Sequence, residues 1–136
     1  MNNFTEGFKK NFWKAFYEYL LIMLPISIYV LLEANHKYSI SYFFTSPEWA
    51  VGTIFLVFTS TFTYYKDVIK DKDKLVNEHL LNLYPLIGII TTVLATLNAH
   101  WSMSGETNWL IFGRILLLIF STIFYFLLMT KPDESK

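Results

Sequence analysis

Four long apolar runs joined by short connectors constrain this chain more than any other feature of its sequence. The runs cover approximately residues 13–33, 48–65, 79–100 and 109–129. Each is close to the length of about 20 mainly apolar residues that a membrane-spanning helix needs. Short connectors make consecutive helices antiparallel neighbours. We therefore expect an all-α integral membrane protein, a single domain over residues 1–136 with four transmembrane helices in an antiparallel bundle.

The composition supports insertion into a lipid bilayer and excludes several other classes of protein. Hydrophobic residues make up 54% of the chain and charged residues only 16%, against about 25% charged residues in soluble domains. The net charge is zero, so no overall positive field would attract a nucleic acid. The chain has no cysteine, which excludes disulfides and cysteine ligands. The first run lacks the small residues of a signal-peptide cleavage site, so we interpret it as a retained helix.

The lysines predict the orientation in the membrane. Nine of the eleven basic residues lie on one side, at or beyond the ends of the runs: Lys9, Lys10, Lys14, Lys66, Lys70, Lys72, Lys74, Lys131 and Lys136. Basic residues are enriched on the cytoplasmic side of membrane proteins. This places both termini, the loop 66–78 and the tail 130–136 in the cytoplasm. The bias of lysine over arginine, with many Asn, Ile, Phe and Tyr, is typical of AT-rich coding DNA and favours a bacterial cytoplasmic membrane.

The only arginine, Arg114, lies inside the fourth run. Ionisable residues at membrane depth are candidates for function. At about 1.5 Å of rise per residue, Arg114 lies about 9 Å to the outer side of the middle of its helix. Four polar residues of other helices share that level: Glu48, Glu33, Asn98 and His100. We expect Arg114 to pair with Glu48, because a carboxylate suits the guanidinium fork; a role in an ion path or an outer ligand site is the alternative.

Glu18 is the second ionisable residue at membrane depth, about 8 Å to the inner side of the middle of its helix. It is either an interfacial glutamate hydrated from the cytoplasm or a carboxylate that binds a proton or a cation. A short chain of four helices with a glutamate in the first one resembles the small multidrug-resistance transporters. The resemblance implies a proton-coupled small-cation transporter that uses Glu18. The flanking Phe-Tyr-Glu-Tyr-Leu-Leu differs from the small-residue context of that family.

Small and hydroxyl-bearing residues gather on the second and third runs. They include Thr59 and Thr63 on the second, and Gly88, Thr92 and Thr96 at four-residue spacing on the third. Small residues let membrane helices approach closely, and hydroxyl groups can hydrogen-bond between helices. A hydroxyl-lined pore would draw on the same residues, so packing and pore lining are both open. Apart from Arg114, the fourth run is large and apolar, and we expect it to face lipid.

The sequence contains no H-E-x-x-H metal motif, no glycine-rich phosphate loop and no G-x-S-x-G nucleophile turn. We therefore expect a non-catalytic membrane subunit without a cofactor or a metal ion. It would act as a homo-oligomer in the bilayer, as a pore, a sensor or an anchor, with a cytoplasmic protein as a further partner. A bacterial stress or phage-defence setting would suit such a subunit.

Overall fold

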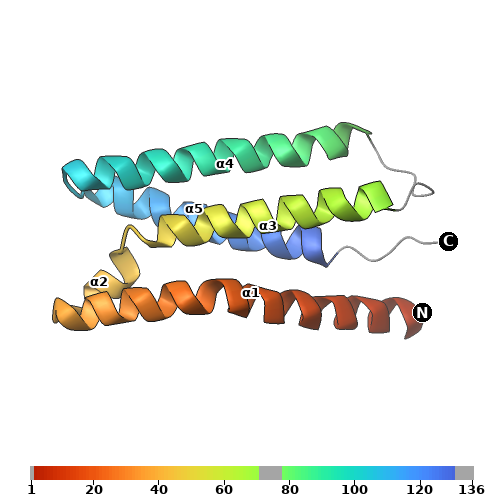
Figure 1. The fold of residues 1–136 in the computed structure, drawn as a ribbon, viewed down its shortest axis with the longest axis horizontal. Helices are drawn as coiled ribbons and strands as arrows, with labels where there is room; N and C mark the ends of the chain where they lie inside the picture. Colours follow the sequence, from red (N-terminus) through yellow and green to blue (C-terminus); the bar gives the residue numbers. More distant parts are fainter. Residues whose placement is uncertain (1, 71–77, 131–136) are drawn as a thin grey trace.

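The computed structural model describes residues 2–70 and 78–130, and within them every regular element is a helix. Four helices are long, namely α1 (Asn2–His36), α3 (Trp49–Lys70), α4 (Glu78–Ser104) and α5 (Asn108–Met129), and α2 (Ile40–Thr45) is short. The long helices lie alongside one another, and successive ones run in opposite directions (Figure 1). The expectation of an all-α protein is confirmed for the described residues.

Three of these helices are long and apolar enough to cross a membrane. They are α1 from Thr5 to His36, α4 from Asn82 to Ser104, and α5 over its whole length. The fourth expected span, α3, is not among them. Hydroxyl-bearing residues at positions 59–61 and 63–65 lower its mean hydropathy.

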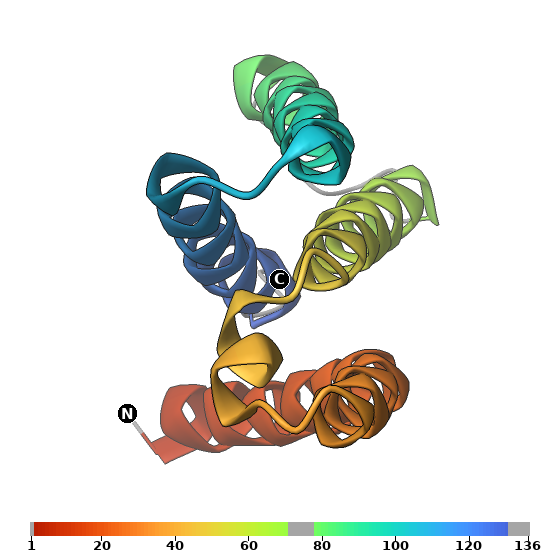
Figure 2. The ribbon, with the colours of Figure 1, turned by 90° about the vertical axis from the view of Figure 1, so that its left-hand side faces the viewer.

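The pair α3 and α5 forms the centre of the molecule. Each of these two helices packs against the other and against both α1 and α4. Helices α1 and α4 lie on opposite sides of the pair (Figure 2). We expected α5 to face lipid, but it buries Ser121, Phe124, Tyr125 and Leu128 against its neighbours. Helix α5 also exposes Phe112, Ile119 and Ile123, so the expectation that it faces lipid stays a prediction.

Helix α1 starts earlier than expected and ends at a defined signal. It begins at Asn2 instead of near residue 13, and Phe8 and Phe12 stack one turn apart with ring centroids separated by 6.5 Å. At its end, Tyr38 adopts a left-handed backbone conformation with φ 51°. The amide of Ser39 then bonds back to the carbonyl of Ala34 at 3.1 Å. This is a Schellman termination, which satisfies carbonyls that the helix end leaves free.

The short helix α2 and the start of α3 both follow capping residues. Ser39 is the N-cap of α2, and its hydroxyl accepts a hydrogen bond from the Tyr42 amide at 3.4 Å. The hydroxyl of Ser46 accepts one from the Glu48 amide at 3.3 Å just before α3. Helix α3 then continues to Lys70, into the segment expected as the loop 66–78. Residues 71–77 of that loop and 131–136 of the expected tail lie outside the described residues.

Two apolar clusters hold the long helices together. The first joins α1, α3 and α5 through Ala15, Met23, Leu56 and Tyr125. The second joins α3 and α5 through Val57, Phe124 and Leu128, with Tyr84 and Ile87 of α4 packed against it. We call the end of the molecule that carries α2 the α2 end (Figure 1).

Candidate functional site

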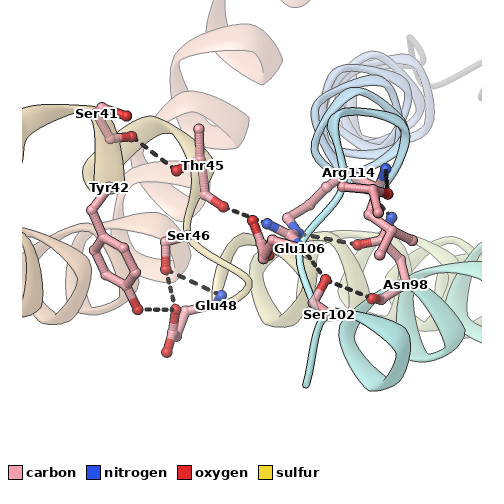
Figure 3. Close-up of polar contacts among 11 residues, drawn as sticks. Ser41, Tyr42, Thr45, Ser46, Glu48, Asn98, Ser102, Glu106 and Arg114 are labelled. Atoms are coloured by element: carbon pink, nitrogen blue, oxygen red, sulfur yellow. Dashed lines mark hydrogen bonds and ion pairs between the residues drawn. The ribbon is translucent and has the colours of Figure 1, made fainter. Parts of the chain in front are cut away.

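Arg114 is the most deeply buried charge in the part of the chain that the structure describes, with 2% of its surface exposed. Its Nε donates a hydrogen bond to Asn98 Oδ1 at 3.1 Å. One Nη donates to the backbone carbonyl of Thr45, and the other donates to the hydroxyl of Ser102 and to Glu106 Oε1, the last at 2.7 Å. The side chain of Arg114 therefore joins α5 to α4, to the α4–α5 turn and to the end of α2 (Figure 3).

The groups around Arg114 are themselves bonded to one another. Asn98 donates from Nδ2 to the carbonyl of Leu110 at 2.8 Å, and Ser102 donates from its hydroxyl to the carbonyl of Asn98 at 2.9 Å. Glu106 neutralises the guanidinium and keeps 35% of its side chain exposed. A buried charge is tolerated when it is paired and hydrogen-bonded in this way. We call the set of Arg114, Asn98, Ser102, Glu106 and the Thr45 carbonyl the Arg114 network.

The local sequence explains how the network forms. Gly105 has φ 144°, a conformation that favours glycine, and it ends α4 after Ser104. Thr107 then caps α5, its hydroxyl accepting a hydrogen bond from the Leu110 amide at 3.4 Å. Side chains of a helix lean toward its N-terminus. Arg114, about two turns into α5, therefore extends back toward the turn that carries Glu106.

Glu48, the expected partner of Arg114, lies in a neighbouring set of contacts. Its Oε2 accepts hydrogen bonds from the hydroxyl of Ser46 and from the phenol of Tyr42, the second at 3.5 Å. The Lys37 amine lies 3.8 Å above the ring of Tyr42. Hydrogen bonding to Tyr42 raises the pKa of Lys37 above its ordinary value, and the carboxylates of Glu33 and Glu48 raise it further. The expected pairing with Glu48 was wrong, because Glu106 of the same hairpin takes that position.

The other expected partners of Arg114 behave differently from one another. Asn98 is in the Arg114 network and is 7% exposed. Glu33 is half-buried at the end of α1 and contributes to the electrostatic environment of Lys37. His100 is exposed on α4. Of the four candidates, the structure brings only Asn98 into contact with Arg114.

Glu18 does not meet Arg114. It is half-buried on α1 and interacts electrostatically with Tyr125 of α5, whose phenol donates a hydrogen bond to the carbonyl of Ala15 at 3.0 Å. Within residues 2–70 and 78–130, no hydrogen bond or ion pair to the Glu18 carboxylate is present. Glu18 thus has a buried aromatic neighbour and no paired cation in the described part of the chain.

The expected packing or pore-lining residues are divided between two environments. Gly88 is buried, and a Cβ atom there would lie 3.1 Å from Thr61 Oγ1 and 3.2 Å from Val57 Cγ1. Thr96 is exposed, and Thr59, Thr63 and Thr92 are partly buried. The surroundings of Gly88 therefore favour close packing of α3 and α4 over pore lining at this position.

Four other serine and threonine residues are buried inside the bundle. They are Thr53, Ser60, Thr91 and Ser121, and the hydroxyl of each donates to a carbonyl of its own helix, at 3.2, 3.0, 2.8 and 2.7 Å. A groove of about 370 Å³ runs between α3 and α4 beside Thr61, with Phe58, Phe62 and Ile89 among its apolar walls. These hydroxyls are satisfied within their own helices, which is typical of a packed interior.

Sequence reasoning missed three members of the Arg114 network, namely Glu106, Ser102 and the Thr45 carbonyl. The signal for Glu106 was its place eight residues before Arg114 in the same hairpin. No group of three or more His, Asp or Glu that could hold a metal ion occurs among the described residues.

Within residues 2–70 and 78–130 the regular elements are helices, and three of them are long and apolar enough to cross a bilayer, as in a multi-pass membrane protein. Comparison with family models, with curated proteins and with solved structures finds no significant match.

Proposed function

We propose that this chain is a non-catalytic membrane subunit with four transmembrane helices in an antiparallel bundle, which acts as a homo-oligomer. Among the roles of pore, sensor and anchor, the anchor or assembly role has the best support. The termini would be cytoplasmic and the membrane would be the bacterial cytoplasmic membrane, with a cytoplasmic protein as a further partner. The α2 end of the molecule would then be the outer end.

The distribution of side chains around α3 supports its crossing the membrane despite its low mean hydropathy. Its exposed face carries Phe55, Phe58 and Phe62, with 55%, 67% and 64% of their surfaces exposed. Its buried face carries Thr53 and Ser60, whose hydroxyls bond to carbonyls of α3. A helix with polar groups inward and phenylalanines outward is compatible with lipid on its outer face.

The Arg114 network is the observation that carries the anchor role. Its acceptors come from this chain, and the guanidinium is 2% exposed. Four of the five N–H donors of the guanidinium are bonded to groups of this chain, so the charge is directed into the protein and not at a transported ion. The Arg114 side chain holds α5, α4 and α2 together. A subunit that supports an assembly needs a rigid structure of this kind.

Two measurements on one preparation test this proposal. Native mass spectrometry in mild detergent is expected to give a homo-oligomer, because the partly buried Thr92 and the exposed Thr96 give α4 a surface of small residues on which a helix of a second copy can pack closely. Liposomes containing the purified protein are expected to pass no more ions or protons than protein-free liposomes. A stable monomer, or flux through the wild-type protein, would contradict the proposal.

The environment of Glu18 favours a second candidate, a proton-coupled small-cation transporter. The carboxylate is half-buried beside Tyr125 and has no polar partner among the described residues, as a proton-binding group would require. This candidate predicts substrate-dependent proton movement that Glu18→Gln abolishes and that Glu33→Gln, a change of the other half-buried glutamate on α1, leaves intact.

A further inference from the structure

Helix α1 is much longer than the bilayer requires. Its 35 residues extend over about 52 Å at a rise of about 1.5 Å per residue, whereas the hydrocarbon core is only about 30 Å thick. The apolar part of α1 lies toward its C-terminal end, where Leu24, Leu31 and Leu32 are exposed. The excess length therefore lies at the start of the helix, beyond the end of the molecule opposite α2.

The start of α1 presents a basic and aromatic face that points away from the bundle. Lys10, Lys14 and Tyr17 follow one another at four- and three-residue spacing and share one side of the helix. All three are exposed, with Tyr17 at 63%. The opposite side of this segment is the one that packs, since Ala15 is buried and Phe12 stacks on Phe126 of α5 with ring centroids 5.6 Å apart.

Two further residues enlarge this face. Lys9 is exposed, and Trp13 is 47% exposed beside Tyr17, with ring centroids 6.3 Å apart. Over residues 5–17 the chain has three lysines and one acid, Glu6. The end of α3, residues 66–70, has two lysines and one acid, Asp67. Three lysines and one acid over residues 5–17 give α1 the larger excess of positive charge.

We infer that the face of Lys9, Lys10, Trp13, Lys14 and Tyr17 binds anionic phospholipid headgroups of the leaflet in which the start of α1 lies. The inference rests on the membrane insertion of α1 that the proposed function includes. Lysines next to a membrane attract anionic lipids, each with about a fivefold gain in affinity. Tryptophan and tyrosine favour the boundary between headgroups and hydrocarbon. Their place on the same face as the lysines favours a lipid over an acidic protein as the occupant.

The test measures how strongly the purified full-length protein prefers phosphatidylglycerol over phosphatidylcholine in mixed nanodiscs, by native mass spectrometry of the lipids that stay bound. The triple variant Lys9→Gln, Lys10→Gln, Lys14→Gln is expected to lose at least about tenfold of this preference. The matched control Lys37→Gln, Lys66→Gln, Lys70→Gln removes the same number of exposed lysines elsewhere. It is expected to lose clearly less of the preference than the α1 triple, because Asp67 weakens the attraction of Lys66 and Lys70 for anionic lipid and Lys37 follows the opposite end of α1.

A charge-conserving variant, Lys9→Arg, Lys10→Arg, Lys14→Arg, is expected to keep the preference and to weaken with added salt as the wild type does. Equal losses in the two glutamine triples, or no preference in the wild type, would overturn the inference and leave the proposed function in place. Failure of the wild type to enter nanodiscs would overturn both. Retention of an acidic protein in place of lipid by the wild type, lost in the glutamine triple, would also overturn it.

Discussion

A single guanidinium at position 114 connects chain segments that are far apart in the sequence. Nε is directed at Asn98, one Nη at the Thr45 carbonyl, and the other at Ser102 and Glu106. The planar fork of arginine can serve three directions at once, whereas the ammonium of lysine is one point charge on a flexible stem. The identity of the side chain matters here as much as its charge.

Replacing Arg114 by lysine is therefore expected to destabilise the protein although the charge is kept. Most of the four contacts would be lost and a buried charge would be poorly paired, which costs about 3 kcal/mol. The free energy of unfolding in mixed micelles of mild detergent and dodecyl sulfate measures the effect. Lys9→Gln, at an exposed position, is the control and should change it by less than about 0.5 kcal/mol. Equal stability of Arg114→Lys and the wild type would contradict this interpretation.

Glu106 is expected to matter only while Arg114 is present. Glu106→Gln keeps an acceptor but removes the counter-charge, at a cost of about 1–2 kcal/mol. In an Arg114→Met background the same change should cost close to nothing, because 35% of the Glu106 side chain is exposed and can be hydrated. A double-mutant cycle gives the coupling energy between the two residues. Additive effects would show that the pair does not interact.

At this scale the sequence predicted the position of the buried charge but only part of its surroundings. The helical rise predicted that Arg114 and Asn98 lie at the same depth in the membrane, and the two residues are in contact. The choice of Glu48 failed because its carboxylate is used by Ser46 and Tyr42. Glu106 lies outside the apolar runs, so a comparison of helix levels did not include it. The tilt of side chains toward the helix N-terminus was the missing argument.

Helices α3 and α4 approach closely at Gly88, beside a buried hydroxyl group that has no hydrogen-bond partner within the described residues. Thr61 Oγ1 is the buried side-chain oxygen that makes no hydrogen bond within the described residues. It lies 3.1 Å from the position of a Cβ at Gly88. An unpaired buried hydroxyl costs free energy that an isosteric methyl group does not.

Thr61→Val is accordingly expected to stabilise the protein by about 1 kcal/mol. Thr53→Val is the matched control on the same helix. Thr53 is fully buried and donates to the Trp49 carbonyl at 3.2 Å, so its replacement should be neutral or destabilising. Thermal unfolding of the two variants in the same detergent compares them directly. The opposite order of stabilities would exclude an unpaired hydroxyl as the cause.

Helix α1 is attached to α5 through few polar contacts. The phenol of Tyr125 donates to the Ala15 carbonyl at 3.0 Å, and Tyr19 and Thr122 share a hydrogen bond of 3.2 Å. Tyr125 is completely buried. Removal of its hydroxyl leaves the carbonyl of Ala15 without this partner.

Tyr125→Phe is expected to lower the free energy of unfolding by about 1 kcal/mol. Because the lost bond joins α1 to α5, amide hydrogen exchange should increase in α1 more than in α4. Tyr17→Phe, at a residue that is 63% exposed, is the control and should change neither quantity. A uniform increase of exchange over all helices would contradict a local role.

The ends of a helix could be predicted where its apolar run was long. They could not be predicted where a capping residue determines the position at which the helix begins or ends. The length of α5 agrees closely with its apolar run. Helix α2 was not predicted because six residues are too few to show a period, and its start depends on the Ser39 cap. The early start of α1 is explained by Phe8, Phe12 and Phe16, which stack at four-residue spacing. They lie in an otherwise polar segment, so the apolar runs did not include Phe8 and Phe12.

For the molecule as a whole, the proposal with the largest consequence is that α3 crosses the membrane. Since the chain has no cysteine, single cysteines can report topology without background. Ser41 and Lys66 flank α3 and are both exposed. A membrane-impermeant maleimide added to intact cells is expected to label Ser41→Cys and not Lys66→Cys, and both should react after the cells are opened. Labelling of both in intact cells, or of neither, would mean that α3 does not span.

The separation of Arg114 from its acceptors along the chain has a consequence for biosynthesis. The Thr45 carbonyl is 69 residues before Arg114, so α2 and α4 leave the ribosome before α5 does. The acceptors on α2 and α4 therefore have no Arg114 to bind until α5 has been made. A chain halted before α5 would carry exposed hydrogen-bonding groups in lipid, a feature by which a membrane protease could recognise an unfinished product.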